Sequence, residues 1–512
     1  MDQGARNPTL PMAAYHRPTG IDQTSHGTSF PLSQIVRGTI PTIQRAIPLL
    51  GLGIALNLLF TPDVSFELLA AYLIIALSAL LGIIIVVRRN QGGLPIAAAL
   101  ILQNGITYGF PILKHNDEYS RIDLSLMLPC AGQLSLFIIT LIVGWKAGLQ
   151  LIHPTPSKLY LVTDNIQKQA KLAKLALGLL TFGLLFQISL YTGIYWRVTG
   201  SFGGRLFSLL QVFVLVASVA GGFLGAYFVR RVPQIKTAYW ALWWGLFVIL
   251  VSSVLLSSAT GLVLSTFAGL MLGARKVPWV AMITILLTLA FLNQGKFVMR
   301  EKYWGPNANE RPSLIELPGF FAEWGSVSAK YLIPSESQVN KADQGQSLAD
   351  RLNNFSNILF VNRALSINNM ETLEGKGYAY LPWVFVPRVL WPDKPRTHEG
   401  QALLNVHFRR QMNYEATETT YVAWGLLPEA QGNLGLWFGP IVLGIFIGTF
   451  CGAAETWSSK KDLASVEGLG ACILLITAVG SFEMSMGVLA AMLFQTAVAL
   501  LVGGIIIRKF IR

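Results

Sequence analysis

Long runs of apolar residues separated by short polar segments dominate this chain. Most runs are roughly 18–24 residues long, and an α-helix needs about 20 apolar residues to cross the hydrocarbon core of a bilayer. The pattern therefore predicts an all-α polytopic membrane protein with about 12 transmembrane helices. The expected spans are about 46–60, 66–87, 93–113, 124–145, 172–192, 206–229, two within 238–274, 278–296, 433–455, 464–482 and 486–507.

Two spans depart from a simple apolar run. The span at 93–113 is rich in Gly and Pro, so a break in its helix is expected. The stretch 238–274 is too long for a single crossing, and its Ser-rich part at 257–261 is the expected point of division. We expect loops outside the membrane at 114–123 and at 191–205.

One polar stretch, 297–432, is far longer than the other connections between spans. Such length is typical of a functional or a disordered loop. This loop has an amphipathic helical pattern at 348–366 and several tryptophans, which indicate a folded external (periplasmic) subdomain between spans 9 and 10. The expected organisation is a disordered cytoplasmic tail (1–40), spans 1–9 (41–296), the loop subdomain carrying the active site (297–432) and spans 10–12 (433–512).

Composition supports the membrane assignment and fixes an orientation. Hydrophobic residues make up 53% of the chain and charged residues only 13%, against about 25% charged residues in a typical soluble protein. The net charge of +13 comes mainly from basic residues beside the spans, on one side of the predicted topology. By the positive-inside rule that side is cytoplasmic, as are both termini. The charge therefore reports orientation, and a nucleic-acid partner is not expected.

Metal and redox chemistry have little support in the sequence. The three cysteines, Cys130, Cys451 and Cys472, lie within apolar spans and offer neither a disulfide nor a zinc pattern. His398 and His407 are not at a recognised ligand spacing. We expect neither a metal nor a cofactor.

The stretch 377–410 concentrates the polar chemistry of the loop. Its centre, Pro387–Pro395, holds three prolines, which exclude a regular helix or a central strand. Cations, histidines and aromatic residues alternate around it. Burying so many charges is costly unless they are paired. The segment is either a rigid cap at the membrane interface or a binding site.

A family resemblance rests on this stretch. The chain resembles the Wzy-type (O-antigen or oligosaccharide repeat-unit) polysaccharide polymerases in Gly377–Tyr380, in the Pro-Arg-x-x-Trp-Pro-x-Lys-Pro pattern of Pro387–Pro395, and in Glu429, Asn433 and Gly435. The aromatics usual in the last element are missing here. The resemblance covers about 60 residues and, beyond them, only the architecture.

The resemblance implies an activity and its partners. It implies a metal-independent glycosyltransferase of the bacterial inner membrane, which transfers an undecaprenyl-diphosphate-linked glycan onto a lipid-linked repeat unit at the outer face. Membrane lipid, a flippase and chain-length regulator proteins are the further partners expected. The sugar and the linkage do not follow from it.

Such a reaction needs cations for the leaving diphosphate, a base for the acceptor hydroxyl and surfaces for sugars. Arg388 is the first candidate for the diphosphate. The other candidate cations are Lys394, Arg396, Arg409, Arg410 and Arg363. Glu429 is the first candidate base, and His398, Glu399 and His407 follow. The expected aromatic platforms are Trp391, Trp383, Tyr378 and Tyr380.

Alternatives remain open for residues and for function. Arg388 could pair with Asp393 to hold the turn, and Glu429 could cap the helix of span 10. The tryptophans could form an interfacial belt. An O-antigen ligase or another lipid-linked glycosyltransferase has a similar architecture. A polysaccharide flippase or transporter is the alternative from another class, although charges within spans are few and no internal repeat is visible.

Overall fold

The computed structural model describes residues 31–59, 64–114, 124–161, 165–254, 256–274, 278–304, 312–330, 353–419 and 422–511. These residues form helices and connecting turns, and none of them lies in a strand, apart from two isolated bridges. Ten of the described helices are long and apolar enough to cross a membrane. Two shorter apolar helices lie at Ala259–Gly273 and Val466–Ser481, within two further expected spans. The chain is thus a helical multi-pass membrane protein, while the count of twelve spans stays a prediction.

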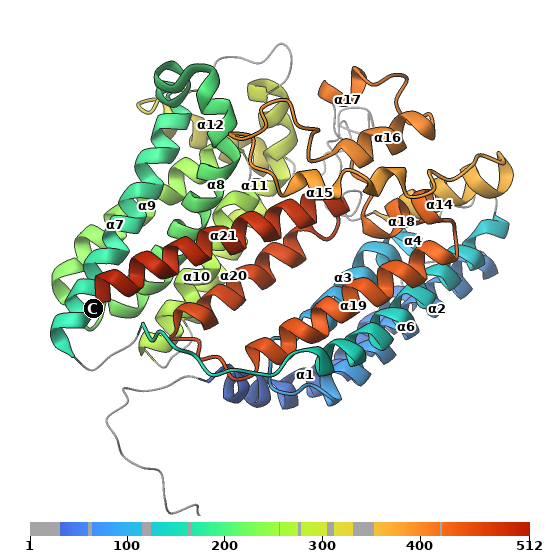
Figure 1. Cartoon of the computed structure of the whole chain (residues 1–512), viewed down its shortest axis with the longest axis horizontal. Coiled ribbons are helices and arrows are strands. Elements are labelled where there is room, and N and C mark those ends of the chain that lie inside the picture. Colours follow the sequence, from blue (N-terminus) through green and yellow to red (C-terminus); the bar gives the residue numbers. More distant parts are fainter. Residues whose placement is uncertain are drawn as a thin grey trace, which may run out of the picture.

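A first bundle forms around one apolar core at the N-terminal side of the molecule (Figure 1). Its helices are α1 (Leu32–Leu59), α2 (Phe66–Arg88), α3 (Ile96–Asn104), α4 (Phe110–Lys114), α6 (Met127–Leu151) and, from the far end of the sequence, α19 (Phe438–Ser458). A π-helical turn at Gly105–Gly109 separates α3 from α4. Residues 96–113 nevertheless form one continuous helix long enough to cross a membrane, so the break expected in the Gly- and Pro-rich span is present only as this local π-helical distortion.

A second bundle holds the middle of the chain. It consists of α7 (Ile166–Tyr191), α8 (Ile194–Phe228), α9 (Lys236–Ser252), α10 (Leu256–Ala274), α11 (Trp279–Trp304) and α12 (Leu317–Lys330). The hairpin of α20 (Val466–Ser481) and α21 (Met486–Ile511) joins the two bundles. Ala471 and Leu489 of this hairpin belong to the first core, whereas Ile473 and Ala499 pack with α7 and α8.

Helices α6 and α19 approach each other backbone to backbone. Glycines recur every four residues on both, at Gly144 and Gly148 on α6 and at Gly444, Gly448 and Gly452 on α19. A Cβ atom at any of these five positions would collide with backbone of the partner helix. Small residues at this spacing let membrane helices pack closely without a hydrophobic driving force. This pair is the tightest seam of the first bundle.

The loop subdomain covers one end of the helices, which we call the loop end (Figure 1). Its described helices are α14 (Phe355–Asn362), α15 (Leu381–Val384), α16 (Glu399–His407), α17 (Ala416–Thr419) and α18 (Leu426–Leu434). A π-helical turn (Arg363–Ile367) and a 3-10 turn (Lys376–Tyr378) connect them. A small apolar core that includes Val361, Leu404, Phe408 and Trp424 holds this layer together.

Several helices extend beyond the bounds that hydropathy predicts. Helix α1 begins at Leu32, so residues 32–40 do not belong to an irregular tail, and residues 1–30 lie outside the described residues. The expected loop at 191–205 is largely helical, because α8 begins at Ile194 and continues across a kink at Gly200. Hydropathy marks only the part of a helix in hydrocarbon, whereas backbone hydrogen bonding continues into the interface.

One expected break and one expected helix lie a few residues away from their predicted positions. The stretch 238–274 divides between α9 and α10, a few residues before 257–261. Val254 takes a positive φ of 56° at this junction, which is rare for a β-branched residue. The amphipathic segment predicted at 348–366 is helical from Phe355, and its first residues lie outside the described part of the chain.

Candidate functional site

The proline-rich segment folds into a compact loop held by its own cations. The guanidinium of Arg388 donates through Nη1 to the carbonyls of Pro392 (3.1 Å) and Lys394 (3.2 Å), and through Nη2 to that of Pro395 (3.5 Å). The Lys394 ammonium donates to the carbonyls of Val384 (3.2 Å) and Val386 (2.5 Å). Prolines cannot donate backbone hydrogen bonds, so these side-chain cations add to the few backbone hydrogen bonds that hold the loop.

The charges of Arg388 and Lys394 lie close together without a neutralising acid. Burial lowers the pKa of Lys394, and the positive charge of Arg388 lowers it further. No ion pair links Arg388 to Asp393, although the structure describes both residues; the alternative in which Asp393 holds the turn is therefore wrong. Two like charges held in one loop attract an anion.

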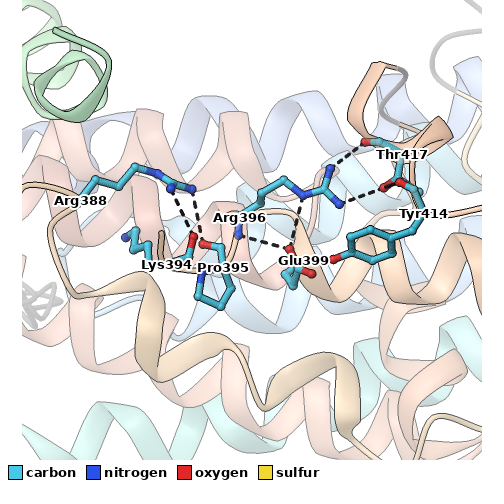
Figure 2. A network of polar contacts seen from close by, with 7 residues as sticks. All are labelled: Arg388, Lys394, Pro395, Arg396, Glu399, Tyr414 and Thr417. Carbon is cyan, nitrogen blue, oxygen red and sulfur yellow. Dashed lines mark hydrogen bonds and ion pairs between the residues drawn. The ribbon is translucent and has the colours of Figure 1, made fainter. Parts of the chain in front are cut away.

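Arg396 is neutralised, unlike these two cations. Figure 2 shows its guanidinium on the other side of Pro395 from that of Arg388. Its Nε pairs with the Glu399 carboxylate at 3.4 Å, and its Nη groups donate to the Thr417 carbonyl (3.2 Å) and hydroxyl (2.9 Å). The ring of Tyr414 lies 4.8 Å from the guanidinium carbon. This residue therefore anchors α16 to α17, and its charge is less available to a ligand.

A cavity of about 700 Å³ lies next to the residues that follow this loop in the chain. It lies between α7, α8, the α9–α10 junction and α21, and Thr397 and His398 form part of its wall at the loop end. Its size is typical of a small-molecule site. Burial lowers the pKa of His398, and the nearby charge of Arg396 adds to this effect. The imidazole is consequently neutral at pH 7 and able to accept a proton.

Glu429 lies on the other side of Thr397, in a small pocket with Tyr380. Its carboxylate is only 2% exposed and accepts the backbone N–H of Met486 at 2.7 Å. Burial raises the pKa of Glu429 to about 8, although this hydrogen bond acts against the shift. Glu429 thus joins α18 to the first residue of α21, and it is mostly protonated at pH 7.

The two halves of the resemblance pattern meet in space. The Asn433 side chain accepts the backbone N–H of Gly377 through Oδ1 at 2.9 Å and donates to the Glu429 carbonyl at 2.9 Å. A Cβ atom at Gly400 would collide with the Gly377 carbonyl. Gly435 ends α18 at a φ of 97°, a conformation that favours glycine. Gly377, Asn433 and Gly435 therefore have structural roles that bring the loop against α18.

The remaining predicted residues lie at the edges of this layer. Trp383 and Trp391 meet edge to face at 5.4 Å between ring centroids and stay partly exposed. Arg410 lies over the rings of Phe360 and Trp424, and burial lowers its pKa. Two further candidate cations, Arg363 and Arg409, are exposed. None of these residues lines the cavity.

Sequence reasoning missed a group of buried amides beneath the loop. Gln133 of α6 donates to Asn362 of α14 at 2.8 Å, and Asn362 donates back at 2.9 Å. Gln431 of α18 donates to the same Gln133 oxygen at 2.6 Å. All three are fully or almost fully buried. Glutamine within an apolar span is costly in lipid and could have served as the signal.

A second buried carboxyl lies nearby, in the turn between α20 and α21. Glu483 accepts a hydrogen bond from Thr107 at 3.2 Å, and burial raises its pKa to about 7. Among the residues that the structure describes, no group of three or more His, Cys, Asp or Glu side chains could hold a metal ion.

Comparisons with known proteins add nothing to this geometry. No protein-family model, no curated protein and no solved structure matches the chain.

Proposed function

We propose that this chain is a membrane glycosyltransferase that polymerises lipid-linked glycans, as the Wzy-type resemblance implies. The observation that carries the proposal is the pair of cations, Arg388 and Lys394, held without a neutralising acid in a loop whose next residues, Thr397 and His398, line a cavity of about 700 Å³. A diphosphate on a lipid in the outer leaflet would reach this loop from the membrane, with its attached sugar at the cavity.

The chemistry follows from the positions of the charges. A hydroxyl of the acceptor sugar attacks the anomeric carbon of the donor, and the bond from that carbon to the diphosphate oxygen breaks. Arg388 stabilises the leaving diphosphate, because a guanidinium has five N–H donors and loop carbonyls take three of them. Lys394 adds a second positive charge.

His398 is the general base in this proposal. It lines the cavity, and its lowered pKa keeps it neutral at pH 7. It can therefore take the hydroxyl proton as the new bond forms. Glu429 was the first candidate from sequence, but a mostly protonated carboxyl that holds the N-terminus of α21 is less suited to this role.

The test compares glycan length in a deletion strain complemented with wild type, Arg388→Ala, His398→Ala or Lys376→Ala. We expect single repeat units in the deletion strain and in the strains complemented with Arg388→Ala or His398→Ala. Lys376 is exposed and lies away from the cavity, so its variant should restore polymer. Protein amounts in the membrane are measured alongside, to separate loss of activity from loss of folding.

The same experiment separates the alternatives. Full-length polymer that remains on its lipid carrier in the deletion strain would show a ligase. Normal polymer with Arg388→Ala would reject the role of the cation pair. Glycan that is unchanged when the gene is deleted would reject the proposed function and favour the flippase or transporter alternative.

A further inference from the structure

Three glutamines from three different membrane helices line the cavity. Gln187 comes from α7, Gln211 from α8 and Gln495 from α21, and all three lie within candidate spans. None of the three forms a hydrogen bond to another residue within the described part of the chain. This distinguishes them from Gln133 and Gln431, whose amides bond to each other.

Three amides without a hydrogen-bond partner favour a polar occupant of the cavity. Each amide offers two N–H donors and a carbonyl acceptor. Gln187 and Gln495 are partly buried and Gln211 is exposed, so all three amides can bond to a molecule that enters the cavity. A prenyl or acyl chain offers them no partner, whereas water or a hydroxyl-rich molecule does. The amide positions therefore argue against a cavity that holds only a lipid tail.

The rest of the wall points to an uncharged molecule. The lining contains no Asp, Glu, Lys or Arg, and His398 is neutral at pH 7. A charged group would lose its hydration there without gaining a counter-ion. The aromatic rings of Trp196 and Phe207, whose centroids are 5.2 Å apart, add flat apolar surface near the N-terminal end of α8. Amides together with aromatic rings suit the hydroxyl edges and apolar faces of a sugar.

We propose that this cavity binds an uncharged saccharide unit of the substrate, and that Gln187, Gln211 and Gln495 recognise its hydroxyl or acetamido groups. The lining itself offers no counter-ion to an acidic sugar, so neutral sugars should bind more tightly. The saccharide is the acceptor end, because His398 lies in the same wall and would receive its proton. The assignment as acceptor rests on the proposed function, but binding of the sugar does not depend on it.

Saturation-transfer NMR on the purified full-length protein in nanodiscs tests the inference. The probes are the methyl glycosides of glucose, galactose and N-acetylglucosamine, with those of glucuronic and galacturonic acid as matched charged sugars and geranylgeraniol as the prenyl chain. The variants are Gln211→Leu and Gln495→Leu. Gln150→Leu is the control, because Gln150 is exposed at the far end of α6 and does not line the cavity.

We expect at least one neutral sugar to bind wild type and Gln150→Leu, and the uronic acids to bind more weakly. Each cavity variant should bind that sugar about tenfold more weakly, as expected for two lost hydrogen bonds. Equal binding by the leucine variants, equal binding of uronic acids, or no signal from any neutral sugar would overturn the inference. Displacement of the sugar by geranylgeraniol would assign the cavity to the prenyl chain.

The binding result and the glycan-length result fail separately. Sugar binding in a protein whose deletion leaves all glycans unchanged would refute the proposed function and keep the saccharide site. Loss of polymer with Arg388→Ala, together with no sugar binding, would keep the function and refute the site.

Discussion

The buried carboxyl of Glu429 makes a quantitative prediction for Glu429→Gln. Burial raises its pKa from 4.5 to about 8, so the folded protein holds a proton that the unfolded chain releases. Stability from this group is complete below about pH 4.5 and is lost as the pH rises toward 8. At about 1.4 kcal/mol per pKa unit, the loss is about 1 kcal/mol at pH 5 and about 3 kcal/mol at pH 7.

Glutamine has no proton to lose, and its amide oxygen can still accept the Met486 N–H. We therefore expect Glu429→Gln to gain most stability over wild type near pH 7–8 and little at pH 5. The assay is thermal unfolding of the purified protein at pH 5, 6, 7 and 8. Glu483, whose pKa is also raised, should leave a residual pH dependence in the variant.

The matched control is Glu418→Gln, because Glu418 is an exposed carboxylate in the same subdomain. It should follow the wild-type curve at every pH. A Glu429→Gln midpoint shifted by the same amount at pH 5 and pH 8 would refute the reasoning, since it would mean that Glu429 titrates normally in the folded protein.

Three further predictions test other parts of the molecule. Arg409 occupies the left-handed position after α16 at a φ of 56°, where glycine is usual. Arg409→Gly should therefore stabilise the protein by about 0.5–1 kcal/mol in thermal unfolding. Arg409→Ala should not stabilise it. Gly448→Leu should abolish the α6–α19 seam and, by gel filtration, leave little folded protein, whereas Gly480→Leu, where a Cβ would meet nothing, should be tolerated. The polymerisation rate should stay constant from pH 8 to about 6.5 and fall in more acidic solution as His398 becomes protonated. If the rate of His398→Ala falls in the same way at acidic pH, His398 is not the base.

The sequence predicts those features of the fold that depend on local pattern. Apolar runs identify the spans because the bilayer requires about 20 apolar residues per crossing. The Gly- and Pro-rich run at 93–113 correctly marks an irregular span, but the irregularity is a π-helical turn within a continuous helix and not a break. Helix ends are less predictable, as Leu32 and Ile194 show, because a helix continues past the hydrocarbon wherever its backbone stays bonded.

The candidate site depends on contacts between distant segments, and sequence reasoning found only part of it. The proline-rich loop is visible as a motif, so Arg388 and Lys394 could be selected. Nothing local shows that His398 borders a cavity formed by α7, α8 and α21, or that Gln211 and Gln495 face that cavity together. Local sequence also gave no reason to rank His398 above Glu429, since burial decides their protonation.

The glycine seam between α6 and α19 has a consequence for how the chain is made. The two helices are separated in sequence by the whole second bundle and by the loop subdomain. During synthesis α6 enters the membrane long before its partner exists, with a face of glycines and no side chains to shield its backbone. The seam can close only after α19 is inserted. The first bundle is therefore completed late, and a chain that ends before residue 438 leaves the glycine face of α6 without its partner helix.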